Sequence, residues 1–370
     1  MEAIQAFLKK KDVEISTKRY LIDAMGAMAQ GLFCSLLIGT IINAMGLLFD
    51  IRALKIVVAT VGGIKYTVGG LAMAMSGPAM AVAIGRALHC PPLVLYSLLT
   101  VGFATNALGG AGGPLAVLFV AIATSEIGKL AAGETKVDIL VTPLVTIGVG
   151  ATLAALCAPP LGKLAMQTGT VIMWATELQP FLMGILVSVF VGIALTLPIS
   201  SAAICAALGL TGLAGGAAVA GCSAQMIGFA VQSYRENGVG GLLSQGLGTS
   251  MLQMPNIVRN PRIWIGPIFA SAITGPLATC VFKLRMDGAA VSSGMGTCGL
   301  VGQIGVFYRD GSLIWQRGTK AAITSFDWAG SSFYSCPASH PISHHQSRLL
   351  PPGLGQKRGY ETLSLWCSLP

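Results

Sequence analysis

The stretch SYRENGVGGLLSQGLGTSMLQMPNIVRNP, from Ser233 to Pro261, places a charged pair, several amides and five glycines inside a very apolar chain. Glycine and proline interrupt helices, and amides are costly in hydrocarbon. The stretch is therefore either an aqueous loop or a working part of the molecule. LLSQGLGTSMLQM is too apolar for a loop in water, and long apolar runs flank it, so we favour a working part.

The composition around this stretch is that of a membrane protein. Of 370 residues, 54% are hydrophobic and only 10% are charged, and the mean hydropathy is +0.74. Soluble domains carry about 25% charged residues. Uncharged runs such as Ala87–Ser125 and Leu178–Tyr234 exceed the roughly 20 residues that cross a bilayer. The composition predicts an all-α, polytopic helical membrane protein with about 8–10 transmembrane helices.

The expected crossings follow from the apolar runs. They lie near 22–48, 66–88, 91–107, 114–131, 139–160, 181–199, 202–231 and 262–284. The piece Lys163–Pro180 is too short to span, and Trp174 suits a headgroup-level position. We expect it to form an interfacial helix that connects two bundles.

The charges indicate orientation. Lysines and arginines crowd the N-terminal segment 1–19, which predicts a cytoplasmic N-terminus and an amphipathic segment there. A surface helix that docks a partner is the alternative. The net charge is +9, but the basic residues flank apolar runs, which does not indicate nucleic-acid binding. The nine cysteines include no CxxC pair, so neither a metal site nor a cofactor is indicated.

Three apolar segments are interrupted by proline. AMAMSGPAMAVA (Ala72–Ala83) and ASAITGPLATCV (Ala270–Val281) share a pattern that ends at Pro78 and Pro276. In the third, Pro198 ends a span, and Ser200 and Ser201 can cap the next one. Breaks at corresponding places in two halves favour a transporter. Ordinary kinked helices that pack through small residues remain the alternative.

The polar residues near the opening stretch form the candidate solute site. Glu236 is the sole acidic residue between Glu177 and Asp287. In hydrocarbon each unsatisfied polar group costs several kcal/mol, so these groups must meet water, one another or a ligand. The nearby glycines permit a re-entrant loop. A solvent-exposed loop with Arg235 and Glu236 as a surface pair is the alternative. The candidate substrate-binding residues are Gln225, Gln232, Glu236, Asn237, Gln245, Gln253 and Asn256, with Ser200 and Ser201.

Three motifs carry a family resemblance. They are TLPISSAAICAALGL, GCSAQMIGFAVQSYRENGVGGLLSQGLGTSMLQMPNIVRNPRIWI and SGMGTCGLVGQIGVF. The chain from about Tyr20 to Val306 resembles the EIIC-type membrane subunits of the phosphotransferase system, in the perfringolysin-regulator-like branch. The resemblance implies a permease in the bacterial plasma membrane with re-entrant hairpins, which takes up a sugar or polyol. It also implies a homodimer and separate IIA- and IIB-type phosphocarrier chains.

Departures from the family leave the enzymatic role open. EIIC proteins use a glutamate and a histidine near the sugar, and Glu236 is the plausible match for the glutamate. No histidine lies between Cys90 and Ser339, and His89 sits at the end of a span. We therefore assign no catalytic residue. At most the chain is the membrane subunit of a protein-phosphohistidine–sugar phosphotransferase, and it includes no phosphoryl-carrying domain.

The expected domain organisation is a cytoplasmic segment 1–19, an EIIC-like membrane domain 20–310 and an atypical tail 311–370. The tail holds three of the five tryptophans and lacks a span-length apolar run, so we expect it to be poorly ordered. A frameshifted or truncated reading frame would explain it. Two other functions stay open: a membrane sensor that binds solute without transport, and an ion-coupled secondary transporter.

Overall fold

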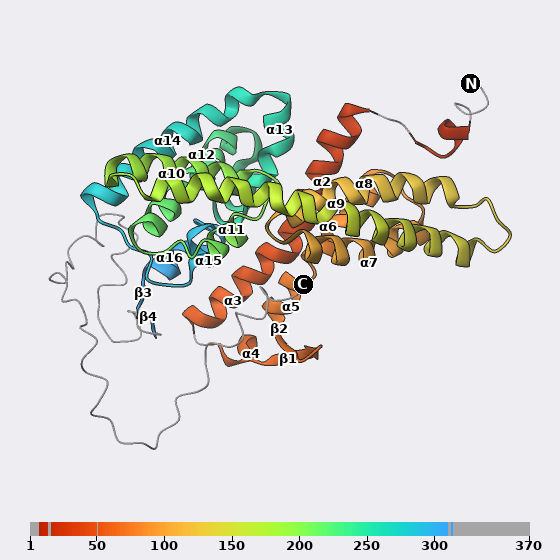
Figure 1. Cartoon of the computed structure of the whole chain (residues 1–370), viewed down its shortest axis with the longest axis horizontal. Helices are drawn as coiled ribbons and strands as arrows, with labels where there is room; N and C mark the ends of the chain where they lie inside the picture. Colours follow the sequence, from red (N-terminus) through yellow and green to blue (C-terminus); the bar gives the residue numbers. More distant parts are fainter. Residues whose placement is uncertain (1–6, 14–15, 50, 310–311, 314–370) are drawn as a thin grey trace, which may run out of the picture. The chain divides into compact units, whose positions relative to one another are not determined.

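The computed structural model describes residues 7–13, 16–49, 51–309 and 312–313, which belong to one compact unit. Except for 312–313, the expected tail lies outside the described residues. The described chain is almost entirely helical (Figure 1). This confirms the prediction of an all-α polytopic protein.

The first part of the fold begins with one long helix and a broken one. The long helix runs from Lys18 to Leu48 and includes two π-helical stretches. The broken helix bends by 51° between α5 and α6, just before Pro78. The elements are η1 (Lys18–Asp23), α2 (Ala24–Leu32), η2 (Phe33–Leu37), α3 (Ile38–Leu48), α4 (Arg52–Lys55), β1 (Val57–Val61), β2 (Ile64–Thr67), α5 (Val68–Ala74) and α6 (Ser76–Ala87).

Two further helices complete the first bundle. They are α7 (Pro92–Gly109) and α8 (Gly113–Ala131), joined by the short helix η3 (Gly110–Gly112). Gly110 has a φ of 51°, which glycine adopts without strain and which reverses the chain. The helices α7 and α8 then pack against each other and against α6 and α9.

Helix α9 (Asp138–Thr176) corrects the predicted boundary near residue 160. The expected span 139–160 and the expected connecting helix 163–180 form one continuous helix of 39 residues. Pro159 and Pro160 do not end it, because the η3 turn packs closely against Leu161 and Gly162 and supports the helix there. At about 1.5 Å per residue α9 is about 58 Å long, about twice the hydrocarbon thickness. The interfacial position of its second half stays a prediction.

The second part contains more interruptions than the sequence predicted. The expected span 202–231 is two helices, because a turn with Gly209 and Gly212 at positive φ separates them. The elements are α10 (Pro180–Thr196), α11 (Ser201–Ala207), α12 (Gly212–Leu243), η4 (Ser244–Gly248), η5 (Ser250–Gln253), α13 (Met254–Arg259), η6 (Pro261–Trp264), α14 (Ile265–Pro276), η7 (Leu277–Val281), α15 (Ala290–Ser293), η8 (Cys298–Leu300), α16 (Val301–Val306), β3 (Tyr308–Arg309) and β4 (Ser312–Leu313).

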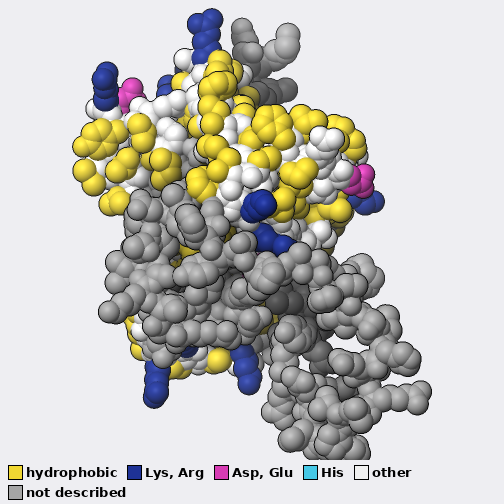
Figure 2. Space-filling model, turned by 90° about the vertical axis from the view of Figure 1, so that its left-hand side faces the viewer, with side chains coloured by type: hydrophobic (Ala, Val, Ile, Leu, Met, Phe, Trp, Pro, Cys, Tyr) yellow, Lys and Arg dark blue, Asp and Glu magenta, His cyan; other side chains and the backbone are white. Residues whose placement is uncertain are grey.

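The described helices have the length and apolar surface that a bilayer requires. Five are long and apolar enough to cross, and the bent pair α5–α6 makes up to six. Figure 2, which views the left-hand side of Figure 1, shows hydrophobic side chains over much of the described surface. On α14 and η7 one exposed side chain follows another every four residues, a spacing that lines one helix face. These are Ile265, Phe269, Ile273, Leu277 and Val281.

Paired glycines hold the helices together. Gly77 of α6 lies directly against Gly102 of α7, and Gly275 of α14 lies against Gly184 of α10. In both pairs the first glycine precedes the proline of the shared sequence pattern. Such close contact of backbones is how membrane helices gain packing energy without a hydrophobic driving force.

A charged network ties the N-terminal segment to the first bundle. The buried Lys129 of α8 donates to the carbonyl oxygens of Asp12 (2.9 Å) and Leu88 (3.1 Å) and lies 2.7 Å from Glu126. Arg19 donates to both carboxylate oxygens of Asp12 and to Leu88 O. Lys129 therefore has two hydrogen-bond acceptors and one ion-pair partner, as a buried charge requires.

We expect the Asp12–Arg19 contact to make stability depend on pH. The two hydrogen bonds from Arg19 lower the pKa of Asp12 from 3.8 to about 2. When folding lowers the pKa of a carboxyl group, the group stabilises the fold at pH values above its unfolded-state pKa. This stabilisation is lost as the pH falls through the folded-state pKa. The thermal midpoint of the purified protein should exceed that of Asp12→Asn at about pH 5, by a margin that narrows as the pH falls toward about 2. A margin independent of pH would contradict this.

Candidate functional site

The opening stretch forms a helical hairpin. Gly238 has a φ of 58° and lies inside α12, where the backbone leaves the helical conformation. Beyond it the chain folds back, because Gln245 donates to Ser233 Oγ at 2.9 Å, twelve residues away. Gly246 likewise lies beside Ala230. A residue without a Cβ makes this reversal possible.

A chain of amides runs from this hairpin to α13. Asn256 Nδ2 donates to Gln253 Oε1, and Gln253 Nε2 donates to Gln245 Oε1, both at 2.9 Å. Gln245 Nε2 then donates to Ser233 Oγ. Gln245 and Gln253 are buried, whereas Asn256 is exposed. Each member supplies the partner that the next one needs, so the chain is buried without a ligand.

Three predicted site residues lie apart from these amides. Glu236, Asn237 and Gln232 are exposed near the turn of the hairpin. Within the described part of the chain, Glu236 forms no ion pair and no side-chain hydrogen bond. In this structure Glu236 does not join the amides in one pocket, and its role in solute binding stays a prediction. Residues 235–238 turn the chain, and a turn points its side chains outward.

Gln225 belongs to a separate contact. It is fully buried in α12, and its Oε1 accepts a hydrogen bond from Trp264 Nε1 at 3.2 Å. Its Nε2 has no hydrogen-bond partner within the described residues. Gln225 thus holds η6 against α12, away from the amide chain.

Ser200 and Ser201 lie where several interrupted segments of the chain meet. Ser200 caps α11 by accepting from Ala203 N, and its own N–H donates to Ala111 O of η3. Ser201 donates to Gly294 O at 2.7 Å. The turn between η4 and η5 supplies Thr249, whose Oγ1 accepts from Met251 N. These turns place residues from both parts of the fold around one point.

A partly enclosed cavity of about 60 Å³ occupies that point, and we call it the serine–threonine cavity. Its polar wall consists of Ser200, Ser201 and Thr249. Its other walls come from the π-helical part of the first long helix, the start of α8, the end of α10 and the loop before η8. These residues are Leu32, Leu36, Leu37, Pro114, Leu195, Ile199, Ala202, Met251, Gly294, Met295 and Cys298. Breaks in helices that line one cavity are typical of transporter binding sites.

Comparison with known protein families matches residues 22–334 to the family described as "Phosphotransferase system, EIIC". The chain belongs to this EIIC family. No curated protein and no solved structure matched it. The match confirms the resemblance inferred from the three motifs. It ends at residue 334, inside the segment that the sequence analysis assigns to the tail.

Membership identifies the general role of this EIIC subunit. It is a permease subunit of a phosphotransferase system and a multi-pass membrane protein. The family also implies a sugar substrate and IIA- and IIB-type partners. Family membership does not assign binding residues to this chain.

Sequence reasoning missed two features of the EIIC subunit. One is Thr249 with the loop Gly294–Cys298, which line part of the serine–threonine cavity. The signal was present in the glycines of SGMGTCG, which were used for the resemblance alone. The other is the buried pair Glu126–Lys129. Opposite charges three residues apart inside an apolar helix would have indicated it.

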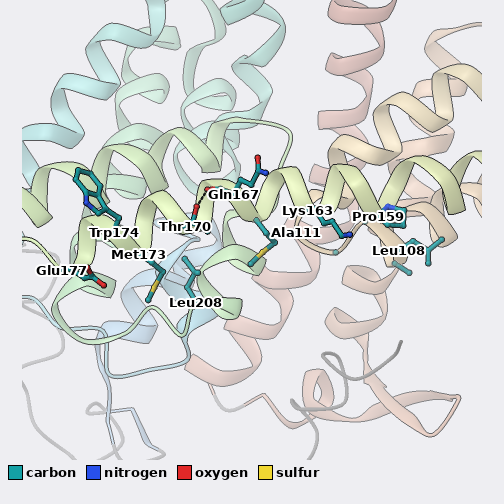
Figure 3. Close-up of a pocket in the computed structure, with 15 residues that line it drawn as sticks. Leu108, Ala111, Pro159, Lys163, Gln167, Thr170, Met173, Trp174, Glu177 and Leu208 are labelled. Atoms are coloured by element: carbon teal, nitrogen blue, oxygen red, sulfur yellow. Dashed lines mark hydrogen bonds between the residues drawn. The ribbon is translucent and has the colours of Figure 1, made fainter.

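The EIIC subunit also has a broad groove along α9, with a volume of about 830 Å³ (Figure 3). Lys163, Gln167, Thr170 and Trp174 of α9 lie along it, and Leu208 lies opposite. Thr170 Oγ1 donates to Gln167 O at 2.7 Å, the dashed line in Figure 3. The groove is open, and its threonine is already satisfied within α9. The serine–threonine cavity is thus the better candidate for a site that encloses a solute.

Proposed function

We propose that this EIIC subunit binds an uncharged sugar or polyol in the serine–threonine cavity and passes it across the bacterial plasma membrane. Its N-terminus faces the cytoplasm, and phosphoryl groups come from separate IIA- and IIB-type chains. The observation that supports this is the meeting of several interrupted segments around one cavity with hydroxyl groups. We propose this cavity as the solute site in place of the pocket of amides and one carboxylate that the sequence predicted.

The chemistry of the cavity favours a neutral, hydroxyl-bearing solute. Ser200 and Thr249 each accept a backbone N–H, which leaves their hydroxyl protons to donate to a ligand. Among the described residues, those that line the cavity include no Lys, Arg, His, Asp or Glu. An ionised ligand would be buried there without a counter-charge, at high cost.

The size of the cavity indicates how solute enters. A water needs roughly 10–15 Å³ of such space, so a cavity of about 60 Å³ holds only a few waters. A sugar requires the surrounding turns to move apart. We assign this movement to the loop 294–298 and the η4–η5 turn, with the breaks near Pro78 and Pro198 and the junction of α14 and η7 at Pro276 as hinges. The amide chain then holds η4, η5 and α13 together as they move.

Filling the cavity tests the proposal. Ala202 lines the cavity from α11, whereas Ala206 of the same helix is exposed and outside it. We expect Ala202→Phe to reduce uptake of a bound sugar by about 100-fold or more, because contacts worth roughly 3 kcal/mol are lost. Ala206→Phe should leave uptake unchanged. The measurement is binding and uptake of tritiated neutral sugars and polyols by vesicles, with thermal unfolding as a check of fold.

The outcomes of this experiment distinguish a permease from a sensor and from an ion-coupled transporter. Equal uptake by Ala202→Phe and the parent protein would rule out the cavity as the solute site. Binding without uptake, even with phosphorylated IIA and IIB chains present, would indicate a sensor. Collapse of an imposed pH gradient on addition of solute would indicate an ion-coupled transporter.

A further inference from the structure

A β-hairpin follows the first long helix. Strands β1 and β2 pair antiparallel, with Thr60 opposite Lys65 and Val61 opposite Ile64. Gly62 and Gly63 form the turn, and both have positive φ, of 57° and 82°. Two-residue turns with positive φ match the twist of hairpin strands, so the sequence specifies this hairpin locally.

The hairpin has one apolar and one polar face near its tip. Opposed residues of a pair share a face, and successive residues alternate. The pair Val61–Ile64 therefore lies on one face, and the pair Ala59–Tyr66 lies on the same face. Thr60 and Lys65 lie on the other. Val61 is 62% exposed and Ile64 is 45% exposed.

Within the described part of the chain, the tip of the apolar face is uncovered at Val61 and Ile64, whereas Ala59 and Tyr66 are half-buried. The hairpin contacts α5 near its base, and nothing lies within 4 Å of the Cβ positions at Gly62 and Gly63. A two-stranded hairpin is marginally stable in water at best. The apolar face therefore needs a cover from outside the described chain.

Charge and position indicate what that cover is. Arg52 and Lys65 are exposed, and the chain from Ile51 to Ser125 contains no acidic residue. The hairpin also lies between two segments that pass as membrane spans, Lys18–Leu47 and the bent pair α5–α6. Apolar and aromatic side chains beside lysine and arginine are typical of segments that lie in the bilayer interface.

We propose that this hairpin is an interfacial anchor whose apolar face inserts among the headgroups of anionic lipids. Val61, Ile64 and Tyr66 enter the boundary between headgroups and acyl chains. Arg52 and Lys65 contact the lipid phosphates. The anchor would hold the end of the first long helix and the start of α5 at a defined depth.

The test compares the two faces in the full chain. An environment-sensitive fluorescent amino acid is placed at position 61 or, as the matched control, at position 60. The protein is reconstituted in phosphatidylcholine vesicles with or without phosphatidylglycerol, and nitroxide-headgroup lipids serve as quenchers. We expect quenching at position 61 to exceed that at position 60 by a factor of about two or more. Phosphatidylglycerol should increase it, and Arg52→Gln with Lys65→Gln should remove that increase.

Three results would overturn the anchor. Equal access of both positions to a water-soluble quencher would show that the hairpin lies in water. Shielding at position 61 without lipid quenching, lost on dilution of the protein in the bilayer, would assign the face to a second copy. Equal quenching with and without phosphatidylglycerol would show that the hairpin does not prefer anionic lipids. Far-UV circular dichroism shows that each labelled protein is folded.

Discussion

Gly275→Val is expected to destabilise the protein by more than about 4 kcal/mol, among the largest effects of a single substitution. Gly275 lies against the backbone of Gly184, and a Cβ at this position would overlap the Gly184 carbonyl group and Ser188 Oγ. Because the neighbour is backbone rather than a flexible side chain, α10 and α14 would have to separate. Thermal unfolding in detergent, followed by circular dichroism, measures the loss.

A matched control uses a helical glycine with free space. Gly148 of α9 has nothing within 4 Å of a Cβ. Gly148→Val should change the thermal midpoint by only a small amount. A similar loss for both variants would show that valine itself, rather than the contact between α10 and α14, determines the effect.

Lys129→Met is expected to lower the free energy of unfolding by about 3–5 kcal/mol. The substitution leaves the Glu126 carboxylate buried without its counter-charge. It also removes the donor to the carbonyl oxygens of Asp12 and Leu88, which holds the N-terminal segment in place. Chemical denaturation of the purified protein measures the change.

The double variant Glu126→Leu with Lys129→Met tests whether the loss of stability comes from an unpaired buried charge or from altered packing. Replacing a buried ion pair by apolar side chains is often neutral, whereas removing one partner is strongly destabilising. The double variant should therefore recover much of the loss. A double variant less stable than Lys129→Met alone would indicate that the two side chains act independently.

The buried pair and the cavity lie in different places and serve different purposes. Lys129 holds the N-terminal segment to α6 and α8. The serine–threonine cavity brings α11 and η5 to the first long helix and η3. Substitutions at the buried pair should therefore reduce stability, and substitutions at the cavity should reduce uptake, independently of each other. Lys129→Met protein that remains folded at low temperature should still bind solute.

Several features were predictable because their causes are local. Hydropathy along the chain identifies the membrane helices, since a span must be apolar whatever it packs against. The glycines around Gly238 predicted an irregular backbone, and the structure has a chain reversal there. Predictions that depended on longer-range packing were less accurate. Residues 160–163 were expected to end a helix, but contacts with the η3 turn keep α9 continuous.

The sequence by itself determined the class of protein, the family and some of the places where helices break, such as the bend before Pro78. Only the tertiary structure decided which polar side chains meet. Glu236 lies exposed at a turn, while Gln245 and Gln253 face inward and satisfy each other. Thr249 joins Ser200 and Ser201, about fifty residues away along the chain. The physical reason is that helix rotation and the contacts between distant segments set the direction of each side chain, and no local pattern encodes either.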